Sequence, residues 1–192
     1  MHMIDYTKQI EEYLMVEREV LSNIKAEEIS NVMNILEKAR MYEKRVFICG
    51  NGGSASTASH FVCDFNKGVS MELEKKYDFE CLSDNVPMMM AIANDISYDD
   101  IFAIPLKNKL AAGDVVIGIS GSGNSENVRR ALEYGKQMGA ITVALTGYDG
   151  GVIKKTADHC IHINVNHMQI VEDVHLILDH MMMYILSKAN AC

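Results

Sequence analysis

The chain has 192 residues and a formal net charge of −8, with 18 Lys and Arg against 26 Asp and Glu. A length of this order suits one domain with a single core, and an apolar fraction of 48% is typical of a globular protein rather than a disordered one. Because the charge is acidic and no apolar run approaches the roughly 18 residues of a membrane span, we expect neither direct nucleic-acid binding nor membrane insertion, and no signal peptide.

Five cysteines lie along the chain without a CxxC pair. Their odd number and their spacing give no disulfide framework. Three fall in apolar strand-like runs, where cysteine packs as a small hydrophobic residue. A reduced, cytoplasmic protein is the simplest interpretation. The five are Cys49, Cys63, Cys81, Cys160 and Cys192.

Residues 3–43 show helical spacing with little glycine or proline, which predicts two helices before the first strand. We expect these helices to cover the sheet or to contact another subunit. The first would present Ile10, Tyr13, Leu14, Val20, Leu21 and Ile24 on one face, and the second Ile29, Val32, Met33, Leu36 and Ala39.

From residue 44 onward, strand-like and helix-like runs alternate. Such alternation predicts parallel strands with right-handed crossovers, hence an α/β three-layer sandwich around one five-stranded sheet. We expect residues 1–192 to form a single domain, with N-terminal helices in 1–43 and the α/β core in 44–192. The strand-like runs are 45–49, 78–83, 114–120, 140–146 and 159–165, and the helix-like runs are 54–66, 86–93, 98–111, 124–138 and 169–189.

Glycine and serine follow the first strand-like run, in Gly50-Asn-Gly-Gly-Ser-Ala-Ser56. A strand–turn–helix junction offers unpaired backbone N–H groups and the positive end of a helix dipole, so it suits an anion such as phosphate. The turn also fits the G-x-G-x-x-A pattern of dinucleotide sites. That pattern needs an acidic residue about 20 positions on, at the end of the next strand, whereas residues 67–74 still precede that strand. We therefore expect no nucleotide cofactor.

A second junction, Gly118-Ile-Ser-Gly-Ser-Gly-Asn-Ser125, follows the third strand-like run. A flexible surface loop is the usual meaning of such a cluster. This one, however, is short and lies directly between a buried strand and a helix, where Ser125 is placed to cap the helix. Two such junctions in one small domain predict a site for a phosphorylated small molecule.

His60 and Asp64 lie four residues apart in the helix-like run 54–66 and share one face. Such a pair serves as an acid–base couple or as two ligands of a divalent metal. On spacing alone, an ordinary surface contact is the more frequent outcome.

The final helix-like run, 169–189, has almost no polar face. A helix that is apolar all round is buried on every side, so we expect an oligomer interface, with the core helix of a monomer as the alternative. On a helical wheel Glu172 and His180 lie about 80° apart and could converge on one ligand. The run holds five ionisable residues, which need partners or a metal when buried: Glu172, Asp173, His175, Asp179 and His180.

Together these motifs resemble the sugar isomerase (SIS) domain family and, within it, the phosphoheptose isomerases. The resemblance runs essentially end to end: it includes both Gly/Ser junctions, Ala93-Asn-Asp95, Leu145-Thr-Gly-Tyr-Asp-Gly-Gly151 and the acidic, histidine-containing last helix. It implies a flavodoxin-like five-stranded parallel sheet and a homotetramer whose subunits share active sites. For Asn94 and Asp95, composition alone indicates only a turn.

The resemblance also implies a role for each site residue. The sugar phosphate would be held by Ser54, Ser120, Ser122 and Ser125, with backbone N–H groups such as that of Gly121. The sugar would contact Asn51, Gly52, Gly53, Asn94, Asp95 and Glu172. Zinc would be held by His60, Asp64, Glu172 and His180.

Two positions depart from the family pattern. Asp64 stands where the family has its catalytic glutamate and is one methylene shorter, and Glu172 replaces a glutamine. With His60 and His180 these residues still form a suitable nitrogen and oxygen set for Zn²⁺. The departures leave three alternatives: a metal-dependent isomerase with shifted geometry, a different substrate, or no activity.

We predict an aldose–ketose isomerase that converts sedoheptulose 7-phosphate to D-glycero-D-manno-heptose 7-phosphate through an enediol(ate). Asp64 would be the base and His180 its acid/base partner. The alternatives are a non-catalytic SIS protein that binds sugar phosphate or docks a partner, and an isomerase of another sugar phosphate. Ionisable groups at all four positions favour catalysis.

Overall fold

A computed structural model describes residues 3–189, so Cys192 lies outside the described residues. Five parallel strands form one sheet in the order β2-β1-β3-β4-β5, which is the flavodoxin-like order and confirms the predicted fold class. Within residues 3–189, no helix combines the length and the apolarity that crossing a bilayer requires. The strands are β1 Val46–Gly50, β2 Phe79–Cys81, β3 Val115–Ser120, β4 Ile141–Thr146 and β5 His159–His162.

Helices cover both faces of the sheet and create two hydrophobic cores. Because successive strand side chains point to opposite faces, Ile48 and Ile117 enter one core, whereas Phe47 and Val116 enter the other. The first core is closed by α2 Ala26–Met41, α3 Gly53–Cys63 and α8 Met168–Ala189, and the second by α5 Ala103–Leu106, α6 Glu126–Gln137 and α7 Ile153–Thr156.

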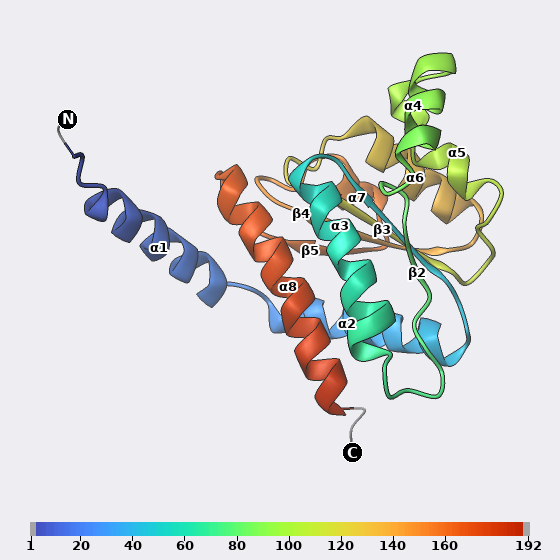
Figure 1. The fold of residues 1–192 in the computed structure, drawn as a ribbon, viewed down its shortest axis with the longest axis horizontal. Coiled ribbons are helices and arrows are strands. Elements are labelled where there is room, and N and C mark those ends of the chain that lie inside the picture. The colour runs from blue at the N-terminus through green and yellow to red at the C-terminus, as the bar shows by residue number, and fades with distance from the viewer. Residues whose placement is uncertain (1–2, 190–192) are drawn as a thin grey trace.

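The first helix, α1 Thr7–Ser22, has no buried residue. It extends away from the body of the molecule (Figure 1), and Ile10 and Met15 are 57% and 61% exposed. The next helix, α2, buries Ile29, Val32 and Leu36 as its spacing predicts. The apolar side chains along one face of α1 are therefore only partly covered by the rest of the chain.

The predicted helix 98–111 is wrong. The segment forms a 3₁₀ turn, Tyr98–Asp100, and then the short α5, Ala103–Leu106, before a loop. Pro105 explains the break, because a continuous helix would need its absent N–H to reach the carbonyl of Ile101. The preceding helix, α4 Val86–Asp95, confirms the predicted run 86–93, whereas the short α7 lies outside the predicted runs.

The helix after β1 changes pitch at its end. The α-helical part, α3, ends at Cys63, and Asp64–Val69 continues as a π-helix. A π segment inside a helical run is rare and often occurs at a functional site. Here it begins at Asp64, the predicted base.

The two Gly/Ser junctions come together at one edge of the sheet. Strands β1 and β3 are neighbours in register, with Gly50 opposite Ile119, so their following turns leave the sheet side by side. Strand order reverses at β1, and ligands bind such α/β sheets at the carboxyl edge beside the reversal. The fold therefore places both junctions where a ligand is expected.

Candidate active site

The first junction, residues 50–54, is called the first crest below. The first four N–H groups of a helix lack intrahelical partners, and α3 begins at Gly53 within this crest. Ser54 is buried at 5% exposure. The first crest thus offers backbone donors and one sheltered hydroxyl at the positive end of an 11-residue helix.

The second junction, residues 120–125, is the second crest. Its hydroxyls are bonded to the crest itself: Ser120 Oγ lies 3.0 Å from Ser125 Oγ and accepts from the Gly123 N–H at 3.1 Å. The Asn124 N–H donates to Ser122 Oγ at 3.2 Å. Ser125 occupies the N-cap position of α6 as predicted, but its side chain makes no capping bond, because it pairs with Ser120 instead.

The loop that follows β4 fixes the backbone conformation of the second crest. Gly123 has a φ of +69°, and a Cβ there would lie 2.1 Å from the carbonyl oxygen of Gly150. The Ile153 N–H donates to the Gly123 carbonyl at 3.0 Å, and the Gly147 N–H donates to that of Gly121 at 2.9 Å. The Gly-rich loop after β4 therefore packs directly on the second crest.

His60, Asp64 and His180 come together from two helical segments, the α3–π run and α8, which lie side by side (Figure 1). His60 Nε2 lies 3.6 Å from Asp64 Oδ2 and 3.0 Å from His180 Nε2. The side chain of His60 is 43% exposed and that of Asp64 is 14% exposed. The predicted His–Asp pair is thus part of a larger group of titratable side chains, which we call the acid/base cluster.

The acid/base cluster fits a divalent metal. One ligand atom of each residue lies within 4.8 Å of the other two. Two nitrogens bound tetrahedrally to Zn²⁺ at its usual bond lengths lie about 3.3 Å apart, close to the observed contact between the two imidazoles. Two histidines and one carboxylate are also a ligand set that catalytic zinc sites use, with a fourth position open to water or substrate.

Glu172 does not join the acid/base cluster within this chain. It precedes His180 by eight residues, which is about 12 Å of helix rise, so the favourable angle on the wheel does not bring the two together. Its carboxylate instead lies against the first crest, where a Cβ at Gly53 would come within 2.5 Å of Oε2. Glycine at position 53 permits this close approach. The predicted four-residue ligand set is therefore not assembled by one chain.

Two buried ionisable residues lie on the inner side of α8. His175 and Asp179 are 1% and 0% exposed, and none of their polar side-chain atoms makes a hydrogen bond of normal geometry. Burial lowers the pKa of His175 to about 4. Burial, with the nearby carboxylate of Asp64, raises the pKa of Asp179 to about 8. The helix that carries His180 is thus polar on its core side, which is costly for folding.

Asn94 and Asp95 lie at the exposed end of α4. The Asn94 amide donates to Asp95 Oδ1 at 2.7 Å, so the two side chains bond each other. The neighbouring Ala93, with Asn51 and Gly52 of the first crest, lines a cavity of about 270 Å³. Neither Asn94 nor Asp95 lines this cavity, so their role toward the sugar stays a prediction.

Residues 6–147 match the family described as SIS domain. The chain belongs to the SIS domain family. This match covers the α1 and α2 helices, both crests and the first four strands.

Similar proteins indicate which branch of the SIS family the chain resembles. The SIS chain is 35% identical over 159 residues to a probable phosphoheptose isomerase of Thermoplasma acidophilum, covering 83% of this chain and 87% of the relative. It is 34% identical over 176 residues to a phosphoheptose isomerase of a Geobacter species, covering 90% and 91%. The solved phosphoheptose isomerase from Neisseria gonorrhoeae superposes with a TM-score of 0.87 at 26% identity, covering 96% of this chain and all of that one.

Short sequence motifs do not predict several residues of this SIS site. Asn127 and Tyr98 both hydrogen-bond the side chain of Asn51, and Ser83 Oγ donates to the Gly50 carbonyl at 2.9 Å. Asn127 lies in α6 two residues after the second junction, and no spacing rule pairs it with the first. Ser83 and Tyr98 follow a short strand and a helix, where serine and tyrosine are ordinary. Only the sheet order reveals their proximity.

Proposed function

We propose that this protein is an aldose–ketose isomerase that converts sedoheptulose 7-phosphate to D-glycero-D-manno-heptose 7-phosphate. The observation that carries the proposal is the acid/base cluster of His60, Asp64 and His180 in a chain similar end to end to phosphoheptose isomerases. A binding module needs the crests but not a carboxylate flanked by two imidazoles.

In this proposal the two crests hold the phosphate group. Phosphate oxygens accept hydrogen bonds, and helix N-termini with serine hydroxyls supply donors at such a site. The donors would be the side chains of Ser54, Ser120, Ser122 and Ser125 with the N–H groups of Gly53 and Gly121. The sugar would extend toward Asn51, Gly52, Asn94, Asp95 and Glu172.

Asp64 would remove the proton from the carbon beside the ketose carbonyl. The electron pair of that C–H bond forms the enediol(ate), and His180 exchanges a proton with the oxygens and returns one to the neighbouring carbon. The net change is a hydrogen shift between adjacent carbons, with no external oxidant. A bridging water would compensate for the shorter arm of aspartate relative to glutamate.

His60, Asp64 and His180 would hold Zn²⁺, and a Glu172 contribution would have to come from another copy of the chain. When bound, zinc supplies positive charge that polarises the substrate carbonyl. The ligand atoms lie within 4.8 Å of one another, which supports this set.

We further propose a homotetramer with shared active sites, built from residues 1–192 acting as one SIS domain. Two surfaces support association: the apolar line of α1, where Leu14 is 41% exposed, and the outer side of α8, where Tyr184 is 59% exposed. A cytoplasmic location stays a prediction from the sequence. The free Cys49, Cys63, Cys81 and Cys160 accord with it.

Purified protein incubated with sedoheptulose 7-phosphate tests the function. Product would be followed by NMR with added Zn²⁺ and with a chelator, and Asp64→Ala would serve as the inactive control. No turnover under any metal condition, with binding of the sugar phosphate intact, would favour the non-catalytic SIS alternative. Turnover of another aldose or ketose phosphate alone would replace the substrate but keep the chemistry.

A further inference from the structure

The two crests are joined by a pair of amides. Asn51 Nδ2 donates to Asn127 Oδ1 at 2.9 Å, and Asn127 Nδ2 donates back to Asn51 Oδ1 at 3.0 Å. Asn51 belongs to the first crest, and Asn127 is the second residue of α6, which opens from the second crest. Asn127 is only 1% exposed and Asn51 is half-buried, so this exchange is partly shielded from water. Buried amide bonds of this kind fix orientation because leaving either partner unpaired is costly.

Asn51 has little hydrogen-bonding capacity left for a ligand. A carboxamide oxygen accepts two hydrogen bonds and its nitrogen donates two. Asn51 Oδ1 accepts from Asn127 and from the Tyr98 hydroxyl, the latter at 2.9 Å, and one Nδ2 hydrogen goes to Asn127. One N–H therefore remains. The Asn51 side chain therefore serves mainly to connect the two crests, and a single N–H donor is left to reach the sugar.

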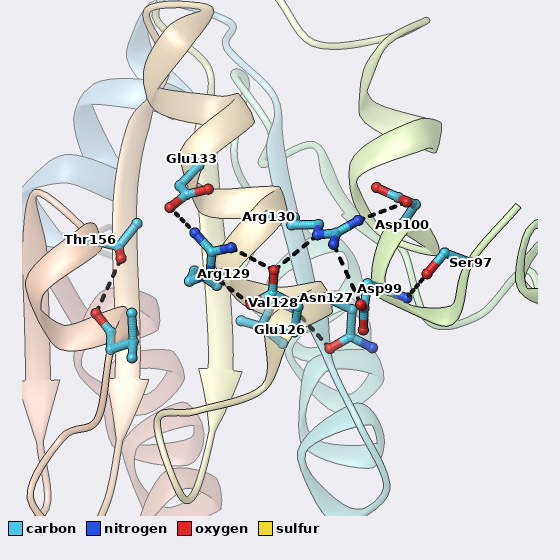
Figure 2. Close-up of polar contacts among 11 residues, drawn as sticks. Ser97, Asp99, Asp100, Glu126, Asn127, Val128, Arg129, Arg130, Glu133 and Thr156 are labelled. Atoms are coloured by element: carbon cyan, nitrogen blue, oxygen red, sulfur yellow. Dashed lines mark hydrogen bonds and ion pairs between the residues drawn. The ribbon is translucent and has the colours of Figure 1, made fainter.

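Asn127 is itself held by the helix that it belongs to. The Val128 N–H donates to Asn127 Oδ1 at 2.9 Å, a bond drawn in Figure 2. Since this N–H lies in the first turn of α6, the side chain of Asn127 satisfies one of the unpaired helix donors. Any shift of α6 relative to the first crest would break bonds at both ends of the Asn127 amide.

Ion pairs tie the Tyr98 segment to the same helix. Arg130 of α6 donates to Asp100 at 2.9 Å and reaches Asp99 at 3.4 Å, while its Nε donates to Glu126 at 3.0 Å (Figure 2). Hydrogen bonds from Arg129 and Arg130 lower the pKa of Glu126 to about 2, so this carboxylate stays charged at neutral pH. Tyr98 is therefore flanked by a segment anchored to α6.

We propose that Asn127 and Tyr98 are positioning residues that hold the two crests in register for a phosphate group, with Arg130 supporting Tyr98. Neither residue is expected to touch the reacting atoms. Their removal would loosen the cradle, so ligand affinity would fall while the acid/base cluster stays intact. The identity of the sugar rests on the proposed function, but the positioning role is testable with inorganic phosphate alone.

The test is a calorimetric titration of the full chain with inorganic phosphate. Tyr98→Phe removes one hydroxyl and keeps the ring, and we expect it to weaken phosphate binding about three- to tenfold, as the loss of one hydrogen bond predicts. Asn127→Leu should weaken it more, by tenfold or above, and Arg130→Gln less than Tyr98→Phe. Tyr42→Phe, whose exposed ring lies at the end of α2, is the matched control and should bind as the wild type does.

Turnover then separates positioning from chemistry. With sedoheptulose 7-phosphate, Tyr98→Phe should raise KM by a similar factor and change kcat less than twofold. Phosphate affinity in Tyr98→Phe equal to that of Tyr42→Phe would overturn the proposal, whether or not Asn127→Leu folds. If the wild type binds phosphate but turns over no sugar, the proposed function fails and the phosphate series alone decides the positioning role.

Discussion

The crests and the acid/base cluster are built in opposite ways. Each crest is a continuous stretch of six residues or fewer. The polar groups of the second crest bond one another or the neighbouring loop, and Asn51 of the first crest bonds Asn127 and Tyr98. The acid/base cluster joins side chains 120 residues apart, from His60 to His180, on the outer surface of two helices. The crests are bonded together within a single chain, whereas the acid/base cluster would leave the fourth position of the proposed zinc open.

This difference separates the residues that we expect to bind the phosphate from those that we expect to transfer protons. In the proposed function the bonded crests hold the phosphate group, and preorganisation of that kind favours affinity. In the proposed function the reaction depends on the acid/base cluster, which lies beside the buried, unpaired His175 and Asp179 of α8. Changes to the cluster should therefore alter turnover, and changes to the crests should alter affinity.

The largest effect should follow Asp64→Asn, which keeps the shape of the side chain but removes the base. We expect kcat to fall about 10²- to 10⁴-fold, the range for loss of a general base. Phosphate affinity should stay within about twofold, because the crests are unchanged. Asp78→Asn, an exposed carboxylate paired with Arg45, is the control. An Asp64→Asn enzyme within tenfold of wild-type kcat would assign the base elsewhere.

Removal of one imidazole should release the metal without disturbing the cradle. Substituting a group that only supports a ligand costs 10- to 100-fold in metal affinity, so His60→Ala should weaken Zn²⁺ binding by more than about 100-fold. Zinc retained after dialysis against a chelator, measured by elemental analysis, gives the readout. His162→Ala, whose ring bonds the Tyr148 carbonyl, is the control. Equal zinc in both variants would contradict the three-residue ligand set.

The two buried ionisable groups of α8 should make stability depend on pH in opposite directions. Asp179, whose pKa is raised to about 8, favours the fold as the pH falls, whereas His175 opposes it. Burial lowers the pKa of His175 from 6.5 to about 4, so the unfolded chain takes up this proton first as the pH falls. The stability that neutral His175 permits is full above pH 6.5 and is lost toward pH 4. Between pH 7 and pH 5 the loss is about 2 kcal/mol.

Denaturant unfolding at both pH values checks this contribution. On going from pH 7 to pH 5, the free energy of unfolding should change about 2 kcal/mol more favourably in His175→Leu than in the wild type, because Asp179 contributes equally to both. His159→Leu removes an exposed histidine and should follow the wild type. Equal changes in all three proteins would mean that His175 is accessible to protons in the folded state.

A single hydroxyl of the second crest should have the smallest effect. Ser122 Oγ accepts one bond, from the Asn124 N–H, and would donate to phosphate. Ser122→Ala should raise KM about tenfold and leave kcat unchanged, because phosphate contacts serve substrate and transition state alike. Ser22→Ala, at the end of α1, controls for surface changes. A fall in kcat with constant KM would place Ser122 in the chemistry.

The sequence predicts the strands, the two crests and the His60–Asp64 pair because these depend on local patterns. Continuous apolar runs specify buried parallel strands, and glycine with serine specifies the turns that follow. The same local reasoning fails at 98–111, where the apolar spacing continues through Pro105 but the hydrogen bonding does not.

Contacts between distant segments were beyond such patterns. On a helical wheel Glu172 and His180 lie at a favourable angle, but a wheel does not show their separation along α8. It therefore overstates how closely the two side chains approach within one chain. The exchange between Asn51 and Asn127 depends on β1 and β3 being neighbours and on how α6 leaves the sheet. Asn127 could be singled out only through that tertiary geometry.

Deuterium incorporation tests the central claim most directly. Wild-type protein with zinc would be given sedoheptulose 7-phosphate in D₂O, and the product would be examined by NMR. Proton transfer through an enediol(ate) by Asp64 predicts D-glycero-D-manno-heptose 7-phosphate that carries deuterium at C2. The rate of its formation should fall strongly in Asp64→Asn. Absence of any aldose product, with or without zinc and with sugar-phosphate binding intact, would contradict the account.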